Sequence, residues 1–223
     1  MIVAERKPIE EILAYIGTAR RIAVAGCGTC VAVCWAGGEK EVELLATELR
    51  MSARLKGKTD VECIETTVQR QCDPEFIEPL EDVVREADIV ISMACGAGVQ
   101  FVARRFPDKI VVPALNTSCI GVNPEPGYWT EYCQACGQCV LSRTGGICPV
   151  ARCSKGILNG PCGGSVDGHC EINPAVECAW QLIYDRLKLQ DRLHLISEVF
   201  EPCDWQAGPS GGPRSVNREE PKK

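Results

Sequence analysis

The chain of 223 residues has few of the side chains on which many metal and nucleic-acid sites depend. It contains only two histidines, His169 and His194, so zinc, copper or non-haem iron sites built on imidazole are disfavoured. Basic residues do not outnumber acidic ones, since 24 Lys and Arg against 30 Asp and Glu give a formal net charge of −6. An acidic chain is a poor match for nucleic acid or for an anionic membrane surface, and we expect neither as a partner.

Long apolar stretches are missing as well. No run approaches the roughly 18 apolar residues that a membrane-spanning helix needs. The N-terminal stretch MIVAERKPIEEI lacks the apolar segment of a secretory signal. We therefore expect a cytoplasmic protein, in a compartment where thiols stay reduced and disulfides are rare.

Cysteine, by contrast, is abundant, with 16 residues. In a reducing compartment this number indicates metal binding rather than a disulfide framework. Eight of them lie between Tyr132 and Trp180, among many glycines and prolines: Cys133, Cys136, Cys139, Cys148, Cys153, Cys162, Cys170 and Cys178. This segment has almost no apolar periodicity, so it cannot bury enough surface to fold alone, and we expect bound metal to order it.

Upstream of that segment, short apolar strands alternate with amphipathic helices. Strands are predicted at 21–25, 61–66, 88–94 and 109–113, and helices at 8–16, 38–55, 79–87 and 99–106. This alternation is typical of an open, mostly parallel α/β sheet, here of the flavodoxin-like kind.

The alternation stops after Asn116, which suggests three parts. An α/β domain is predicted at 1–120. A cysteine-rich iron–sulfur module follows at 121–206; it starts with a linker at 121–132 and ends with C-terminal helices, the first from Pro174 with Tyr184 on its buried face. A disordered tail is predicted at 207–223, because that stretch is mainly proline, glycine, serine and charge.

Cys27, Cys30 and Cys34 follow the first strand with the spacing C-x2-C-x3-C. Three thiolates in one tight turn suit a cubane iron–sulfur cluster, which takes one sulfur ligand per iron. In a doubly wound sheet the first and third strands flank the point where the strand order reverses, and this favours Cys95 as the fourth ligand. Cys72, after the second strand, is the alternative, either as the fourth ligand or as a thiol beside the cluster.

Glycines surround these thiols. We expect Gly28, Gly96 and Gly98 to let backbone N–H groups approach the cluster closely. A dinucleotide-binding interpretation of Gly26-x-Gly28 is weak, because Val31 stands where that fingerprint needs a third small residue.

The eight clustered cysteines match the number that two four-iron clusters require. Cys133, Cys136 and Cys139 have the C-x2-C-x2-C spacing that wraps a cubane in bacterial ferredoxins. One partition combines these three with Cys178 and leaves the other four for the second cluster. Exchanging Cys148 and Cys178 gives the other partition, and spacing does not decide between them. Structural zinc bound by four cysteines is the competing interpretation of each set.

Four stretches resemble the small iron–sulfur subunit of methylenetetrahydrofolate reductase from acetogens and other anaerobes, a zinc- or iron–sulfur-type family whose C-terminal part is a recognised domain. They are GCGTC-x3-C-x2-GGE at 26–39, SMACGAGVQ at 92–100, PALNT at 113–117 and CGQCVLSRTGGICPVARCSKGILNGPCGG-x3-GHCE at 136–171. ECAWQLIYDRL at 177–187 and the ending Pro202-x-Asp204-Trp205 extend the likeness, which covers about residues 10–205.

The resemblance implies an electron-transfer subunit without catalytic residues of its own. It would relay electrons through three [4Fe-4S] clusters to the flavin of a partner TIM-barrel subunit, which reduces 5,10-methylenetetrahydrofolate to 5-methyltetrahydrofolate in the one-carbon metabolism of the Wood–Ljungdahl pathway. The donor would be a ferredoxin, a nicotinamide-oxidising module or a heterodisulfide-reductase-type assembly.

By the same resemblance the metal ligands are Cys27, Cys30, Cys34, Cys95 and the eight clustered cysteines, while Cys63, Cys119 and Cys203 are structural. The alternative function is a structural zinc-binding scaffold in the same complex, without a redox role.

Overall fold

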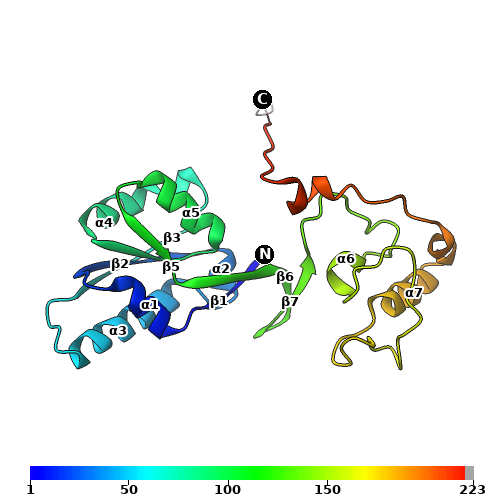
Figure 1. Ribbon diagram of the computed structural model, residues 1–223, viewed down its shortest axis with the longest axis horizontal. Helices are drawn as coiled ribbons and strands as arrows, with labels where there is room; N and C mark the ends of the chain where they lie inside the picture. The colour runs from blue at the N-terminus through cyan, green and yellow to red at the C-terminus, as the bar shows by residue number, and fades with distance from the viewer. Residues whose placement is uncertain (219–223) are drawn as a thin grey trace. The chain divides into compact units, whose positions relative to one another are not determined.

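The computed structural model describes residues 1–218 of the chain (Figure 1). It divides into two compact units, the first spanning Met1–Thr130 and the second beginning at Glu131. None of the helices within residues 1–218 is long and apolar enough to cross a membrane.

The first unit is built on a parallel sheet of four strands in the order β3-β2-β4-β5. The strands are β2 (Arg21–Cys27), β3 (Glu62–Val68), β4 (Ile89–Met93) and β5 (Ile110–Pro113). All three pairings are parallel, and β2 lies between β3 and β4. The prediction of an α/β fold with a parallel sheet is confirmed, including the reversal of strand order beside the first strand of the sheet.

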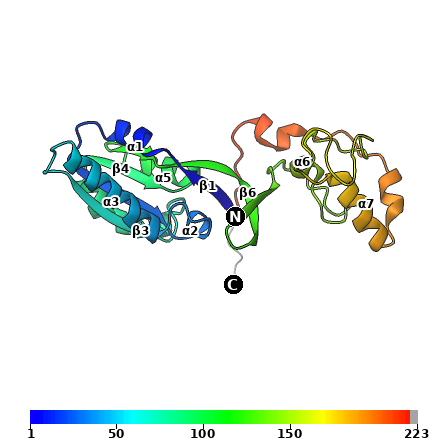
Figure 2. The ribbon, with the colours of Figure 1, turned by 90° about the horizontal axis from the view of Figure 1, so that it is seen from below.

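Helices cover both faces of this sheet (Figures 1 and 2). They are α1 (Ile9–Ile16), α2 (Cys30–Val33), α3 (Glu39–Leu55), α4 (Glu81–Glu86) and α5 (Gly96–Arg105), with two 3-10 turns, η1 (Pro74–Phe76) and η2 (Glu78–Leu80). Successive residues of β2 point to opposite faces: Ile22 and Val24 pack in a core with α1 and α3, and Ala23 and Ala25 pack in a core with α4 and α5. The sheet is therefore buried on both sides, which explains its uniformly apolar central strands.

The longest helix, α3, follows directly from local sequence. Val42, Leu45 and Leu49 are buried on one face, at the spacing that an amphipathic helix requires. At its start, the Gly38 N–H donates to Glu41 Oε2 over 2.9 Å, which satisfies one of the unpaired donors of the first turn.

An antiparallel sheet that the sequence pattern does not reveal begins in the first unit, and its last strand continues past Thr130 into the first residues of the second unit. Its order is β1-β6-β7, with β1 (Ile2–Arg6), β6 (Leu115–Glu125) and β7 (Tyr128–Cys133). The expectation of a linker at 121–132 is wrong, because most of those residues are strand. β6 is largely exposed and polar, and it pairs with β1 from Ile2↔Ile120 to Arg6↔Leu115. This strand could not be predicted from the sequence, because it has no local apolar pattern and its partner lies far away in the chain.

The second unit has little regular structure. Its elements are α6 (Pro149–Arg152), α7 (Ala179–Leu189), η3 (Leu193–Ser197), η4 (Trp205–Ala207) and η5 (Pro209–Gly211). Its core is small and consists of Trp180, Ile183, Leu187, Leu195 and Phe200, with partly buried neighbours around it.

Helix α7 begins at Ala179, five residues later than the predicted start at Pro174. The preceding residues are held differently, because the Cys178 N–H donates to Gly168 O over 2.7 Å and His169 forms a β-bridge with Glu177. Tyr184, expected on the buried face, is 42% exposed.

The predicted tail from residue 207 includes η5 and a contact with the start of the second unit. Arg214 Nη1 donates to Ala135 O over 2.8 Å and to Ala207 O over 3.1 Å. Residues 219–223 of that predicted tail lie outside the described residues.

Candidate functional site

The first cysteine set lies at the carboxyl ends of neighbouring strands. Cys27 is the last residue of β2, Cys30 begins α2, and Cys34 directly follows α2. Cys95 directly precedes α5, two residues after the end of β4. Because the register pairs Gly26 with Met93, β2 and β4 end at the same edge of the sheet, and the predicted ligands lie in the segments that follow those strand ends.

Cys72 lies at this edge too. Partial burial raises the pKa of its thiol, and the nearby Cys95 and Cys27 thiols raise that pKa further. Cys72 is thus within electrostatic range of two predicted ligands, so it stays a candidate beside Cys95 for the fourth position.

Two thiols of the first set, those of Cys34 and Cys27, contact backbone carbonyl groups. Cys34 is buried, which raises the pKa of its thiol, and its Sγ donates to Val31 O over 3.5 Å and to Ala4 O over 3.7 Å. Cys27 Sγ lies 3.8 Å from Gln69 O and 3.9 Å from Thr29 Oγ1.

The three glycines that we expected to approach a cluster make hydrogen bonds or close packing contacts with other residues of the protein. The Gly28 N–H donates to Val68 O, and the Gly96 N–H donates to Thr117 Oγ1, each over 2.9 Å. A Cβ atom at Gly98 would lie 2.7 Å from the Ala94 Cβ, so packing alone requires glycine there. Contact of these glycines with a cluster stays a prediction.

Sequence reasoning missed Gln71, which holds this edge together. Its side chain is completely buried, and Nε2 donates to Ala25 O over 2.8 Å and to Gly26 O over 3.0 Å. Its Oε1 accepts a bond from Ser92 Oγ over 2.6 Å. One amide therefore connects β2, β4 and the residue before Cys72, although nothing in the sequence marks this glutamine as buried.

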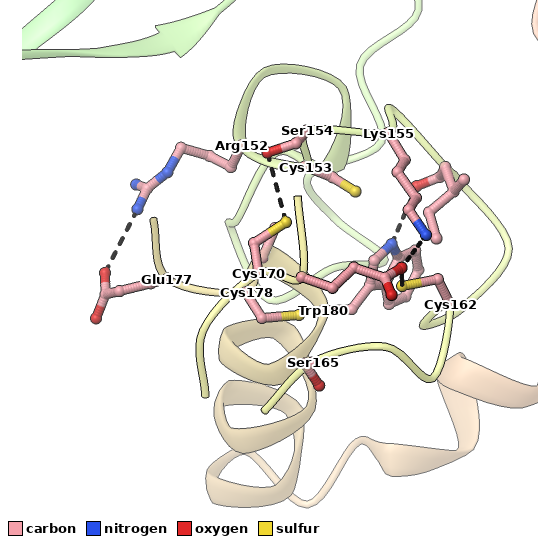
Figure 3. A pocket seen from close by; sticks show the side chains of 13 residues that line it. Arg152, Cys153, Ser154, Lys155, Cys162, Ser165, Cys170, Glu177, Cys178 and Trp180 are labelled. Carbon is pink, nitrogen blue, oxygen red and sulfur yellow. Dashed lines mark hydrogen bonds and ion pairs between the residues drawn. The ribbon is translucent and has the colours of Figure 1, made fainter. Parts of the chain in front are cut away.

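In the second unit, four cysteines line one cavity. They are Cys153, Cys162, Cys170 and Cys178. Figure 3 shows their sulfur atoms facing the same space, one from the end of α6, one from the start of α7 and two from the loops between. Residues up to 25 positions apart, from Cys153 to Cys178, thus converge on one site.

Polar groups surround these sulfurs. The Gly164 N–H donates to Cys162 Sγ over 3.4 Å, and Cys170 Sγ lies 3.5 Å from Ser154 Oγ. The Ser154 hydroxyl, followed by the backbone N–H groups of Ile172 and Asn173, lowers the pKa of the Cys170 thiol. Hydrogen bonds to sulfur favour the thiolate, which is the form that binds metal.

A charged pair borders the same cavity. Lys155 forms an ion pair with Glu171, whose Oε1 also accepts a bond from Cys162 Sγ over 3.6 Å. The Lys155 hydrogen bond is the main cause that lowers the pKa of Glu171. An ammonium group is thereby held beside the thiols.

A second cavity in this unit is lined by Cys133 and Cys148, together with Tyr132, Arg152, Leu141, Gly146, Ile147, Glu177, Leu182 and Arg186. The Ala135 N–H donates to Cys133 Sγ over 3.4 Å. Ala135 adopts a left-handed backbone with φ 51°, which is uncommon for a residue other than glycine. Cys136 and Cys139 lie on the same loop as Cys133 but outside the cavity lining.

Comparison with known proteins gives one match, and it covers part of the chain. Residues 112–206 match a family model described as "Methylene-tetrahydrofolate reductase C terminal". The match supports an association with methylenetetrahydrofolate reductase, and it contains all eight clustered cysteines. No curated protein and no solved structure matches the chain.

Both cavities thus lie within the segment that matches this family model. The first cysteine set, from Cys27 to Cys95, lies outside that segment. Within residues 1–218 no group of three or more His, Cys, Asp or Glu side chains is arranged to hold a metal ion. Coordination by the cysteine sets stays a prediction.

Proposed function

We propose that this chain is the electron-transfer subunit of a methylenetetrahydrofolate reductase complex. The observation that carries the proposal is the single cavity lined by Cys153, Cys162, Cys170 and Cys178, inside the segment that matches the reductase family. The four thiols come from separate segments and line one space, and they supply one ligand for each iron of a cubane cluster.

The donor set fits such a cluster. The lining offers four thiols and no imidazole, and the carboxylate of Glu171 is engaged by Lys155. The Gly164 N–H and the Ser154 hydroxyl lie within reach of cysteine sulfurs, as is usual around iron–sulfur clusters.

The cavities favour one of the two partitions of the eight cysteines. We assign Cys153, Cys162, Cys170 and Cys178 to one [4Fe-4S] cluster. The other would then take Cys133, Cys136, Cys139 and Cys148, two of which line the second cavity. A third cluster would take Cys27, Cys30 and Cys34, with Cys95 or Cys72 as its fourth ligand. Bound clusters of this kind accept and release one electron at a time.

In this function the chain supplies thiolates, hydrogen-bond donors to sulfur and fixed charges, and it performs no bond chemistry on folate. A flavin-bearing partner subunit would combine two electrons and two protons with 5,10-methylenetetrahydrofolate to give 5-methyltetrahydrofolate. A ferredoxin, a nicotinamide-oxidising module or a heterodisulfide-reductase-type assembly would supply the electrons.

Metal and sulfide analysis tests the cofactor. We expect about twelve irons and twelve acid-labile sulfides per anaerobically purified chain, with an EPR signal after dithionite reduction. The Cys162→Ser variant should lose about four of each, whereas Cys63→Ser, a matched change at a buried residue of β3, should lose none. Stoichiometric zinc without sulfide would refute the redox role and support a structural zinc-binding scaffold.

Reconstitution tests the role in the complex. The dithionite-reduced chain alone should leave methylenetetrahydrofolate unchanged, and product should form when the flavin-bearing reductase subunit is added. Turnover by the chain alone would contradict a purely electron-transferring role.

A further inference from the structure

The four thiols around the first cavity are not held equally firmly. Cys162 is exposed, whereas the other three are partly buried. Each of those three has a backbone N–H group that donates to a carbonyl: Cys153 to Pro149 O over 3.2 Å, Cys170 to Val176 O over 2.9 Å and Cys178 to Gly168 O over 2.7 Å. Within residues 1–218, no backbone–backbone hydrogen bond involves residues 160–165, the Cys162 loop. The backbone alone therefore does not fix the position of the Cys162 thiol.

Two glycines give the Cys162 loop further freedom. Gly160 and Gly163 lie on either side of Cys162 and adopt a left-handed backbone, with φ values of 91° and 79°. Glycine occupies this region most readily, and it loses the most conformational freedom when it becomes ordered. Side-chain contacts, rather than the backbone of the loop, must therefore keep this thiol in the lining of the cavity.

An ion pair from outside the loop supplies such a contact. Lys155 pairs with Glu171, and Cys162 Sγ lies 3.6 Å from Glu171 Oε1. Lys155 lies two residues after Cys153, and Glu171 directly follows Cys170. The pair thus connects the segments of two anchored thiols beside the loop that carries the third. Figure 3 shows Lys155 and Cys162 on the same side of the cavity.

Gly164 allows the carboxylate to lie directly against the Cys162 loop. A Cβ atom at Gly164 would lie only 2.1 Å from Glu171 Oε2, so any side chain there would displace the carboxylate. The Gly164 N–H also donates to Cys162 Sγ over 3.4 Å. The carboxylate of Glu171 therefore touches the loop at its backbone and at its thiol.

We propose that Lys155 and Glu171 are a positioning pair that holds the Cys162 loop against the first cavity and so slows the release of metal from its four thiols. The inference rests on the proposed function, because it requires metal bound by these thiols. A bound metal leaves more readily when one of its ligands can swing away, and Cys162 is the ligand that the backbone holds least. The two side chains are 35% and 39% exposed, so solvent screens the pair and its effect on the rate is moderate.

Release of iron to a ferrous chelator, from the anaerobically purified full-length chain, tests the pair. The irons of the first cavity are those that the Cys162→Ser variant lacks. Lys155→Glu and Glu171→Lys should each release these irons about fivefold faster than the wild type, because like charges then repel across the loop. The double variant Lys155→Glu/Glu171→Lys restores opposite charges and should return the rate toward that of the wild type.

Two further variants separate the pair from general effects. Lys188→Glu makes the same change in charge at an exposed residue of α7 that lines neither cavity, and it should leave the rate unchanged. Gly164→Ala displaces the Glu171 carboxylate without any change in charge, and it should speed the release of the same irons. Irons outside the first cavity should leave at the wild-type rate in every variant.

Failure of the inference differs from failure of the proposed function. Unchanged rates in both charge variants, a double variant no slower than they are, or equal acceleration by Lys188→Glu would overturn the positioning role and leave the electron-transfer function standing. If a single variant contains no iron at the first cavity, the double variant decides: restored iron supports the pair, and continued absence overturns it. A wild-type chain with zinc and no sulfide would overturn the proposed function, and release of that zinc to a chelator would then test the pair with the same variants.

Discussion

Gln71 connects two strands of the parallel sheet through one buried amide, which contacts Ala25 O, Gly26 O and Ser92 Oγ. Burial of a polar group costs free energy unless its hydrogen bonds are made inside the protein. The hydrogen bonds of Gln71 meet this requirement, and they connect β2, β4 and the residue before Cys72.

Replacement of this amide should destabilise the first unit. Gln71→Leu removes one hydrogen bond from each of two backbone carbonyls and from the Ser92 hydroxyl, and we expect the free energy of unfolding to fall by about 2–4 kcal/mol in urea denaturation. Gln100→Leu is the matched control, because Gln100 makes one exposed hydrogen bond, to Gly96 O, and its loss should change stability by less than about 0.5 kcal/mol. Equal effects of the two changes would mean that the buried amide contributes nothing specific.

Asp88 gives the first unit a pH-dependent contact. Its Oδ2 accepts bonds from the backbone N–H groups of Arg21 and Arg20, each over 2.9 Å, and these donors lower the pKa of the carboxyl. Because the folded-state pKa lies below the unfolded one, the contact stabilises the fold above the usual Asp pKa and is lost as the pH falls through the folded value.

The Asp88→Asn variant tests this contact. At neutral pH it should melt at a lower temperature than the wild type, and the difference should shrink as the pH falls below about 4. Thermal denaturation followed by circular dichroism between pH 3 and pH 7 measures the effect. A difference that stays constant over this range would show that the charge of Asp88 is not involved.

At the scale of elements, helix α7 provides most of the apolar core of the second unit. Ile183 and Leu187 are completely buried against Leu195 and Phe200, while Leu189 on the same helix is 84% exposed. The helix also starts at the residue after Cys178, so its packing fixes one of the four thiols around the first cavity.

Two leucine variants compare a buried position of α7 with an exposed one. Leu187→Ala should destabilise the second unit by about 2–5 kcal/mol, since it leaves a cavity in a small core. Leu189→Ala removes the same atoms from an exposed position and should have little effect. Hydrogen exchange of the amides in α7 reports both, and comparable exchange in the two variants would contradict the packing described for α7.

The elements also show what the sequence could and could not predict. Strands β2 and β4 are predictable because they are apolar runs buried on both faces and end in glycine-rich turns. Strand β6 is not, because it exposes most of its polar side chains and pairs with β1, more than 100 residues away in the chain.

The same distinction holds for the candidate site. Cysteines are visible by residue type and spacing, so the sets could be predicted, but their grouping depends on loops whose paths the spacing does not determine. Gln71 was not predictable, because it acts through partners distant in sequence and has no motif of its own.

At the scale of the whole molecule, the two units differ in how much apolar surface they bury. The first has two cores, one on each face of its sheet, whereas the second has one core of five buried apolar side chains and few regular elements. We expect a unit with so small a core to depend on bound metal for part of its stability.

Removal of metal should therefore affect the second unit most. After anaerobic treatment with an iron chelator, we expect amide protection to fall within 131–218 and to persist in β2 and β4. Hydrogen exchange followed by mass spectrometry measures this, and reconstitution with iron and sulfide is the control. Unchanged protection in 131–218 would mean that the module folds without bound metal.

The pairing of β1 with β6 sets an order of events during synthesis. All four strands of the parallel sheet precede β6 in the chain, so that sheet can form while β1 still has no partner. At about 5–20 residues per second, the ribosome needs roughly 6–24 s to deliver β6 after β1. During that interval the edge of Ile2–Ala4 is available to chaperones or to other nascent chains, and pairing with β6 then covers it.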